Sequence, residues 1–195
     1  MVKILTPLPR SLFKGINGDF IFTKMGVVFT GDAVLNYRGK NLIFLGLCGK
    51  INKKLKIGDI TVPSDCLINE SFSDIIEKGI KKKIIKTEPD VLRKIEKFEN
   101  IKITRNVTFP SLKMEKKFLK VFKELKIDTV DMELSTVLSA SKFKKIKLFP
   151  FLIVSDTAGR DDFSLKSKNE IRDSIIYILK IIKNLGVRGL EPPRE

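Results

Sequence analysis

The sequence predicts an α/β sandwich with a mixed sheet, because expected strands dominate the first half of the chain and helices alternate with strands in the second. Continuous apolar runs at residues 42–47 and 148–154 are typical of strands buried inside a sheet. Apolar residues at helical spacing follow later, most clearly between residues 167 and 185. This order favours a mixed sheet over an all-parallel one.

Five further segments are expected to be strands. Residues 20–23 and 27–30 form the first two, with Gly26 as the turn between them. The others are residues 57–62, 83–86 and 101–108. Within the run at 148–154, Pro150 suits the beginning of a strand better than its middle, because proline cannot donate a ladder hydrogen bond.

Four segments are expected to be helices. Residues 87–90 offer a capping threonine, an early proline and an acid near the positive helix end, before an apolar stripe. Stripes at residues 118–125 and 132–144 predict two more helices. The last helix begins with a capping box at residues 167–170, and Gly186 stands where its C-terminal cap is expected.

The length of 195 residues suits a single domain with a substantial core. We expect that domain over residues 1–186, and a poorly ordered tail rich in glycine and proline at residues 187–195. No apolar run reaches the roughly 18 residues that span a bilayer, and prolines and Arg10 interrupt the first apolar segment. We therefore expect a cytoplasmic protein with no membrane contact.

The absence of histidine excludes Ser-His and Cys-His nucleophile pairs and histidine metal sites. Cys48 and Cys66 have no neighbouring cysteine, so neither a disulfide framework nor a metal site is expected. No cofactor is predicted. Acid and base chemistry in this chain must use Asp, Glu, Lys, Cys or Tyr.

The net charge of +15 allows contact with nucleic acid or another anion. The lysines are dispersed along the chain, however, and no aromatic residues alternate with them in a basic motif. The pattern favours a solvated basic surface and makes nucleic acid an unlikely partner. A nucleic-acid-binding module stays open as an alternative from another class of function.

Polar residues and glycines follow several expected strands, where α/β sheets bind ligands. They are found at residues 31–33, at residues 46–49, at residues 130–133 and at Ser155 with Asp156. Each also has a purely structural interpretation. The glycines allow tight turns, the acids at 131 and 133 favour the positive end of a helix, and Ser155 with Asp156 caps a turn.

The sequences VDMEL at residues 130–134 and FLIVSDTAG at residues 151–159 resemble the nucleoside phosphorylase and nucleosidase superfamily, which includes purine nucleoside phosphorylases, methylthioadenosine/adenosylhomocysteine nucleosidases and futalosine hydrolases. Earlier segments resemble family turns in the same order, and the resemblance covers about residues 27–185. These segments are residues 30–36, 46–49, 56–60 and 108–109.

The resemblance implies a three-layer α/β/α sandwich that cleaves the N-glycosidic bond of a nucleoside, purine nucleosides above all. Asp156 would protonate the departing base, and Glu133 would accept hydrogen bonds from the ribose hydroxyls and face the positive charge developing on the sugar. The remaining implied roles are a sugar wall at Met132, base stacking at Phe109, orientation by Ser155, and substrate contacts at Cys48 and Gly49. Homo-oligomers, dimers or larger, are also implied.

Three departures from the family pattern shape the prediction. Ala33 replaces a glycine, and the segment between Asn36 and Gly46 is short for the helix expected there. Leu47 replaces the hydroxyl that helps to bind phosphate, so hydrolysis is favoured over phosphorolysis. Leu47 and residues 159–161 also resemble the futalosine-hydrolase branch.

The third departure is the lack of an acid in residues 4–12, where nucleosidases of the superfamily carry a water-activating glutamate. Asp32 and Glu70 are the candidate substitutes. A phosphate-dependent phosphorylase and a noncatalytic nucleoside-binding protein of the same fold are the alternatives.

Overall fold

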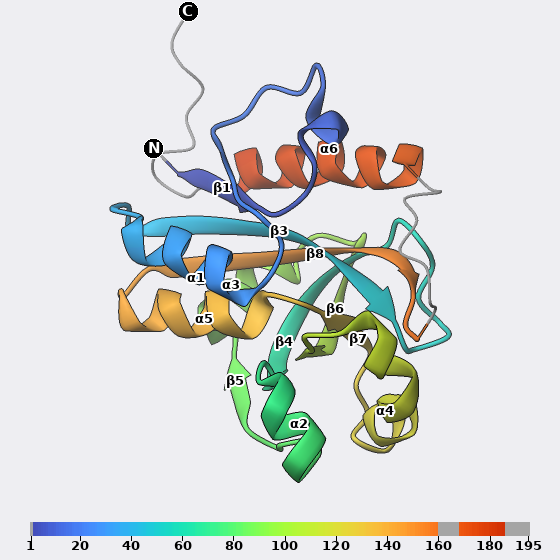
Figure 1. Ribbon diagram of the computed structural model, residues 1–195. Coiled ribbons are helices and arrows are strands. Elements are labelled where there is room, and N and C mark those ends of the chain that lie inside the picture. Colours follow the sequence, from blue (N-terminus) through green and yellow to red (C-terminus); the bar gives the residue numbers. More distant parts are fainter. Residues whose placement is uncertain (1, 160–167, 186–195) are drawn as a thin grey trace, which may run out of the picture.

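The computed structural model describes residues 2–159 and 168–185, which form a mixed sheet with helices on both sides (Figure 1). The strands are β1 (Lys3–Thr6), β2 (Phe20–Phe22), β3 (Asn41–Lys50), β4 (Ile60–Ile68), β5 (Ile84–Lys86), β6 (Ile101–Thr108), β7 (Thr129–Asp131) and β8 (Lys147–Thr157). The helices are the 3₁₀ turn η1 (Arg10–Phe13), α1 (Val27–Asn36), α2 (Phe72–Lys78), α3 (Pro89–Ile95), α4 (Leu112–Glu124), α5 (Leu134–Phe143) and α6 (Lys168–Asn184). The predicted α/β fold with a mixed sheet is confirmed.

Five strands of the sheet form a closed circuit of hydrogen-bonded neighbours. The strand order is β2-β1-β3-β7-β6-β4-β5, and β8 joins β3 to β4 on the other side. β8 is parallel to β3 and antiparallel to β4, whereas β7 is antiparallel to β3. The long parallel pair β3 and β8 therefore delivers its two carboxyl ends to the same end of this circuit, beside β7.

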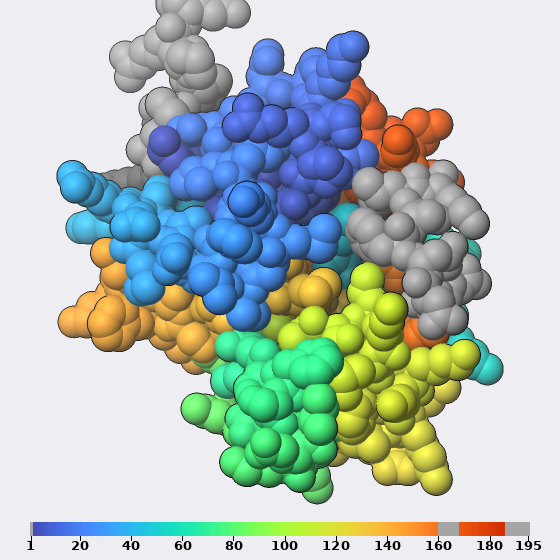
Figure 2. Space-filling view, in the orientation of Figure 1, coloured from blue at the N-terminus to red at the C-terminus, as the bar shows by residue number. Residues whose placement is uncertain are grey.

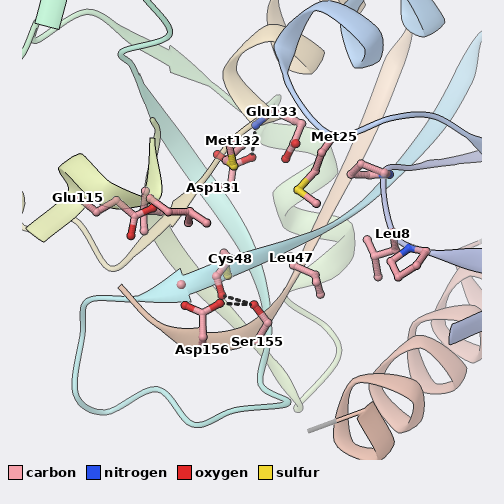
Figure 3. A pocket seen from close by; sticks show the side chains of 15 residues that line it. Leu8, Met25, Leu47, Cys48, Glu115, Asp131, Met132, Glu133, Ser155 and Asp156 are labelled. Carbon is pink, nitrogen blue, oxygen red and sulfur yellow. Dashed lines mark hydrogen bonds between the residues drawn. The ribbon is translucent and has the colours of Figure 1, made fainter. Parts of the chain in front are cut away.

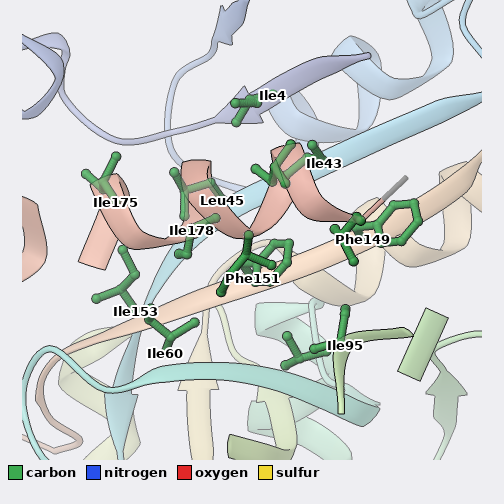
Figure 4. Close-up of a cluster of buried hydrophobic side chains, with 14 of the residues drawn as sticks. Ile4, Ile43, Leu45, Ile60, Ile95, Phe149, Phe151, Ile153, Ile175 and Ile178 are labelled. Carbon is green, nitrogen blue, oxygen red and sulfur yellow. The ribbon is translucent and has the colours of Figure 1, made fainter. Parts of the chain in front are cut away.

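Hydrophobic residues fill both sides of the β3–β8 pair. On one side, the isoleucines of α6 pack against the strands, and Figure 4 shows Ile175 and Ile178 in one cluster with Phe151 and Leu45. On the other side, α1 and α5 cover a second cluster that includes Leu134. Burying each such side chain contributes about 1.5–3 kcal/mol to stability. No helix in the described part of the chain is long and apolar enough to cross a membrane.

The strands expected at residues 42–47, 101–108 and 148–154 are confirmed as β3, β6 and β8. The expectation that Pro150 begins a strand is wrong, because Pro150 lies inside β8 and pairs with Phe44 of β3. β4 pairs with β8 only at Leu152 and Ile153, so no strand requires a hydrogen bond from the other side of Pro150.

The strand expected at residues 27–30 is also wrong, since these residues begin α1. β-branched and aromatic residues favour a strand locally, but here they join a helix that packs on α5. Gly31 allows this contact, because a Cβ at this position would lie 2.9 Å from Thr136 Cγ2. Tertiary packing thus overrides the local preference. Gly26 precedes the helix at a φ of 104°, which favours glycine.

The four predicted helices are confirmed as α3, α4, α5 and α6, although α4 begins six residues before the predicted stripe at 118–125. The expected caps of α6 at Ser167 and Gly186, and the tail at 187–195, lie outside the described residues. The single-domain boundaries stay a prediction. The short elements β1, β7 and α2 have no counterpart among the expected segments.

Candidate functional site

A pocket of about 130 Å³ opens where β3, β7 and β8 end (Figure 3). Its wall comes from the ends of β3 and β8, the β7–α5 junction, the start of α4, Met25 and the N-terminal segment before η1. The lining residues are Pro7, Leu8, Pro9, Met25, Leu47, Cys48, Gly49, Leu112, Glu115, Val130, Asp131, Met132, Glu133, Ser155 and Asp156. Six of the seven predicted site residues therefore meet in one cavity.

The register of β3 and β8 places Gly49 beside Asp156. Cys48 pairs with Val154 and Gly49 with Asp156, because the ladder bulges between Cys48 and Gly49. A Cβ on Gly49 would lie 2.9 Å from Asp156 Oδ1 and 3.3 Å from the backbone of Ala158. The glycine is thus needed for the close approach of the acid, and is more than a turn residue.

Ser155 orients Asp156 at the end of β8. The Ser155 hydroxyl donates to Asp156 Oδ2 at 2.8 Å and lies 3.4 Å from the carbonyl oxygen of Cys48. Burial raises the pKa of the Cys48 thiol well above its usual value. Cys48 therefore contributes a neutral side chain and a backbone carbonyl to the wall, and is no thiolate nucleophile.

Asp131 holds the β7–α5 junction together. Its carboxylate accepts hydrogen bonds from Asn106 Nδ2, Thr108 Oγ1 and the backbone N–H groups of Glu133 and Leu134, at 2.6–2.9 Å. The last two are unpaired donors of the first turn of α5, so Asp131 acts as a cap. Burial raises its pKa, and these hydrogen bonds oppose the shift.

Glu133 lies next to this cap, with only 3% of its surface exposed. Its Oε1 accepts a hydrogen bond from the Gly26 N–H at 2.7 Å, which ties the start of α5 to the start of α1. Burial, and secondly the charge of Asp131, raises the pKa of Glu133 to about 8. In the ligand-free protein Glu133 therefore binds a proton at neutral pH.

Met132 lines the pocket next to Glu133, and its role as a sugar wall stays a prediction. Phe109 is not among the lining residues. It is fully buried, and its ring packs against Phe118 and Phe122 at centroid distances of 5.5 and 5.4 Å. The helix α4 covers Phe109, so the structure does not bring the predicted stacking residue to the cavity.

Neither candidate water activator lines this pocket. Asp32 and Glu70 both border a separate groove between α1 and α5. Glu70 accepts a hydrogen bond from the Ser135 hydroxyl there. The N-terminal segment contributes Pro7, Leu8 and Pro9 to the pocket, none of which can act as a base.

Glu115 is a lining residue that the sequence analysis did not identify. It is 3% exposed, and its Oε2 accepts a hydrogen bond from the Gly159 N–H at 3.0 Å. Burial raises its pKa to about 7, the Gly159 contact opposes the shift, and the charge of Asp156 adds to it. Its spacing offered a signal, because Glu115 shares a helix face with Leu119 and the buried Phe122.

The pocket is acidic although the chain is strongly basic. Four carboxyl groups line it, those of Glu115, Asp131, Glu133 and Asp156, and no lysine or arginine is among its described lining residues. In residues 2–159 and 168–185, no group of three Cys, Asp or Glu residues has a geometry that could hold a metal ion. The pocket suits a neutral ligand with several polar groups better than an anion.

The sequence profile of the phosphorylase superfamily matches residues 23–183 of the chain. This match confirms the superfamily that the motifs at residues 130–134 and 151–159 indicate. No curated protein sequence matches the chain.

Several solved structures share the fold. A 5'-methylthioadenosine/S-adenosyl homocysteine nucleosidase from Campylobacter jejuni superposes with a TM-score of 0.73 at 17% identity, over 94% of this chain and 99% of that one. A futalosine hydrolase mutant of Helicobacter pylori superposes with a TM-score of 0.73 at 14% identity, over 92% of this chain and 98% of that one. A putative 5'-methylthioadenosine/S-adenosylhomocysteine nucleosidase from Francisella philomiragia superposes with a TM-score of 0.75 at 18% identity, over 93% of this chain and 98% of that one.

Proposed function

Because this chain belongs to the phosphorylase superfamily, we propose that it hydrolyses the N-glycosidic bond of a nucleoside, with purine nucleosides as substrates. The observation that carries the proposal is the meeting of Asp156 and Glu133 in one pocket at the strand ends. The structurally similar proteins support hydrolysis of an N-glycosidic bond, because they are named as a methylthioadenosine/adenosylhomocysteine nucleosidase and a futalosine hydrolase.

Asp156 would act as the general acid. Bond cleavage leaves negative charge on the base, and a proton from Asp156 neutralises it as the bond breaks. Ser155 keeps the carboxyl turned toward the cavity through its hydrogen bond to Oδ2. Because Gly49 has no side chain, it leaves the space in which the nucleobase would approach the carboxyl of Asp156.

Glu133 would bind the sugar next to the wall formed by Met132. The sugar becomes positively charged in an oxocarbenium-like transition state, and a carboxylate nearby stabilises it. Since the pKa of Glu133 is about 8, the group must lose its proton before it can play this role. Activity that depends on ionised Glu133 therefore increases as the pH rises toward that value.

Water is the favoured acceptor. Phosphate would need donors or cations at the sugar, but Leu47 offers no hydroxyl and the described lining residues include no lysine or arginine. With no carboxylate from Pro7–Pro9, the reaction would rely on departure of the protonated base more than on a strong base for water. A phosphorylase is the alternative enzyme.

The direct test is release of base from a panel of purine nucleosides, with and without phosphate. We expect phosphate-independent release, and a loss of about 10²- to 10⁴-fold in the Asp156→Asn variant, which lacks the acid. Asp173→Asn, an exposed position on α6, is the matched control. Release of the base only in the presence of phosphate would show that the enzyme is a phosphorylase instead.

A noncatalytic nucleoside-binding protein is the second candidate, because segment 4–12 supplies no base for water. In that case nucleosides would raise the melting temperature while no base is released. The alternative of a nucleic-acid-binding module predicts DNA or RNA binding that weakens steeply as the salt concentration rises.

The cytoplasm stays the predicted compartment of the protein.

We also propose that the chain forms homodimers through α1 and α5. These helices lie side by side on one surface of the molecule (Figure 2). The surface exposes 66% of Val28 and 81% of Phe143, beside Phe29 and Leu35. Light scattering checks the mass, and Phe143→Lys should shift it toward the monomer, whereas a monomeric parent would contradict the proposal.

A further inference from the structure

Glu115 is a buried acid that the fold itself does not require. It lies on the inner face of α4 and receives a hydrogen bond from the Gly159 N–H. An amide or hydroxyl side chain could accept that bond without the cost of burying an ionisable group. A carboxyl in this position points to a ligand contact, since its side chain also lines the pocket.

Glu115 belongs to the same end of the pocket as Asp156. Gly159, its hydrogen-bond donor, follows Asp156 by three residues, and Asp156, when it is ionised, raises the pKa of Glu115. Figure 3 shows both carboxyls on the side of the cavity away from Leu8 and Met25, with Glu115 carried by α4 and Asp156 by β8. A base that receives a proton from Asp156 would therefore also present an atom to Glu115.

The two carboxyls match the edge of a purine that carries N7 and the 6-substituent. A 6-oxopurine presents two acceptors on this edge, whereas adenine presents an acceptor at N7 and a donor at its amino group. Oε2 of Glu115 already accepts the Gly159 N–H. When the group is protonated, its O–H is the donor that faces the ligand.

We propose that Glu115 is a specificity-determining residue that donates a hydrogen bond to the 6-oxo group of the base, so that the pocket selects 6-oxopurines over adenine. The inference rests on the proposed function and names the base for the same site. Asp156 donates a hydrogen bond to the neighbouring ring nitrogen N7. Together the two acids donate to both acceptors on this edge of the purine, N7 and the 6-oxo group.

The charge environment supports a protonated Glu115. The ionisable groups that share the pocket are Asp156 from β8, Asp131 and Glu133 from the β7–α5 junction, and the Cys48 thiol from β3, with no cation among the described lining residues. Burial is the main reason that Glu115 retains its proton, and the charge of Asp156 adds to this effect. The pKa of Glu115 is raised to about 7, so the group donates below this pH and only accepts above it.

Calorimetric titration with free hypoxanthine and free adenine tests the inference without relying on turnover. At a pH of about 6, the wild type should bind hypoxanthine at least about fivefold more tightly than adenine. At a pH of about 8 the preference should shrink, because ionised Glu115 repels the oxo group and accepts from the amino group.

Glu115→Gln keeps a donor that cannot ionise, since its amide oxygen can accept the Gly159 N–H while its NH₂ faces the base. This variant should prefer hypoxanthine equally at both pH values. Glu115→Ala should lose the preference, and Glu124→Gln, exposed on the same helix, should behave as the wild type. Circular dichroism confirms that each variant is folded.

The outcomes separate this inference from the proposed function. Binding of both bases with equal affinity, tighter binding of adenine at the lower pH, or an unchanged pH response in Glu115→Gln would overturn the role of Glu115 while leaving a base-binding pocket. Failure of the wild type to bind either base would overturn both.

Discussion

The pocket contains two pairs of carboxyls that the fold holds in different ways. Asp131 and Glu133 come from one continuous segment, and four hydrogen bonds fix Asp131 at the start of α5. Glu115 and Asp156 come from α4 and β8, which are distant in sequence, and the Gly159 N–H and the Ser155 hydroxyl hold them. The end of the pocket that we propose binds the sugar (the sugar end) is thus built into the secondary structure. The end that we propose binds the base (the base end) depends on how α4 and β8 meet.

Among the four acids, Asp131 alone has a positioning role, whereas we propose that Glu133, Glu115 and Asp156 contact the ligand. Asp131 uses its carboxylate to satisfy buried donors, so its role in the pocket is to raise the pKa of Glu133 and fix its backbone. At the other end, neither Glu115 nor Asp156 caps a helix.

The largest effect on the comparison is expected from Glu133→Gln at the sugar end. Hydrogen bonds to charged groups contribute about 1.5–3 kcal/mol, so kcat/KM should fall about 10- to 100-fold. The wild type should gain activity as the pH rises toward about 8, because Glu133 loses its proton there. The variant should lack this acidic limb.

A pH–rate profile on a purine nucleoside checks both parts, with Glu124→Gln as the exposed control. An acidic limb that persists in Glu133→Gln would assign the ionisation to another carboxyl and contradict the proposed role.

Asp131→Asn should mainly affect stability. The amide cannot accept from all four donors, and each buried donor left unpaired costs about 1–3 kcal/mol. Urea denaturation should therefore show a loss of about 2–3 kcal/mol. The acidic limb of any Glu133-dependent activity should also move to lower pH, since the charge of Asp131 no longer raises the pKa of Glu133.

A stability loss without any shift of that limb would mean that the charge of Asp131 does not reach Glu133. Asp128→Asn is unsuitable as a control, because Asp128 also accepts buried hydrogen bonds, so the exposed Asp173→Asn serves instead.

Much of the fold was predictable because its strongest patterns are local. β3 and β8 are continuous apolar runs, and α6 has helical spacing throughout. The helix α1 was not predictable, because its first residues favour a strand and only the packing of Gly31 on Thr136 reveals the helix. Local preference fails where a tertiary contact decides the conformation.

The candidate site shows the same division. Glu133 and Asp156 follow from the motifs at residues 130–134 and 151–159, each of which is one continuous segment that includes the end of a strand. The position of α4 decides that Phe109 is covered and that Glu115 reaches the pocket. No local pattern specifies where a helix docks, so both the missing stacking residue and the additional acid required the structure.

Glu115→Gln should alter how stability depends on pH at the base end. A carboxyl with a pKa of about 7 when folded and its ordinary value of 4.5 when unfolded binds more protons in the folded state between these values. Stability of the wild type therefore falls as the pH rises through this window. Urea denaturation should show the variant about 3 kcal/mol more stable at a pH of about 8 and equal near 4.5.

Glu124→Gln, at an exposed site of the same helix, should leave the pH dependence unchanged. Parallel stability curves for Glu115→Gln and the wild type would show that Glu115 ionises as it does in water, and would remove the contrast between the pocket ends.

The smallest effect is expected from Ser155→Ala, which removes the hydroxyl that donates to Asp156 Oδ2. One neutral donor contributes about 1 kcal/mol, so kcat/KM should fall about fivefold. Without this hydrogen bond, the carboxyl of Asp156 is no longer held in its orientation toward the cavity. Steady-state kinetics should therefore show the loss in kcat with little change in KM, and Ser73→Ala, at an exposed position in α2, should change neither constant. A fall comparable to that of Asp156→Asn would instead mean that Ser155 contacts the reacting base directly, and would make the base end as tightly specified as the sugar end.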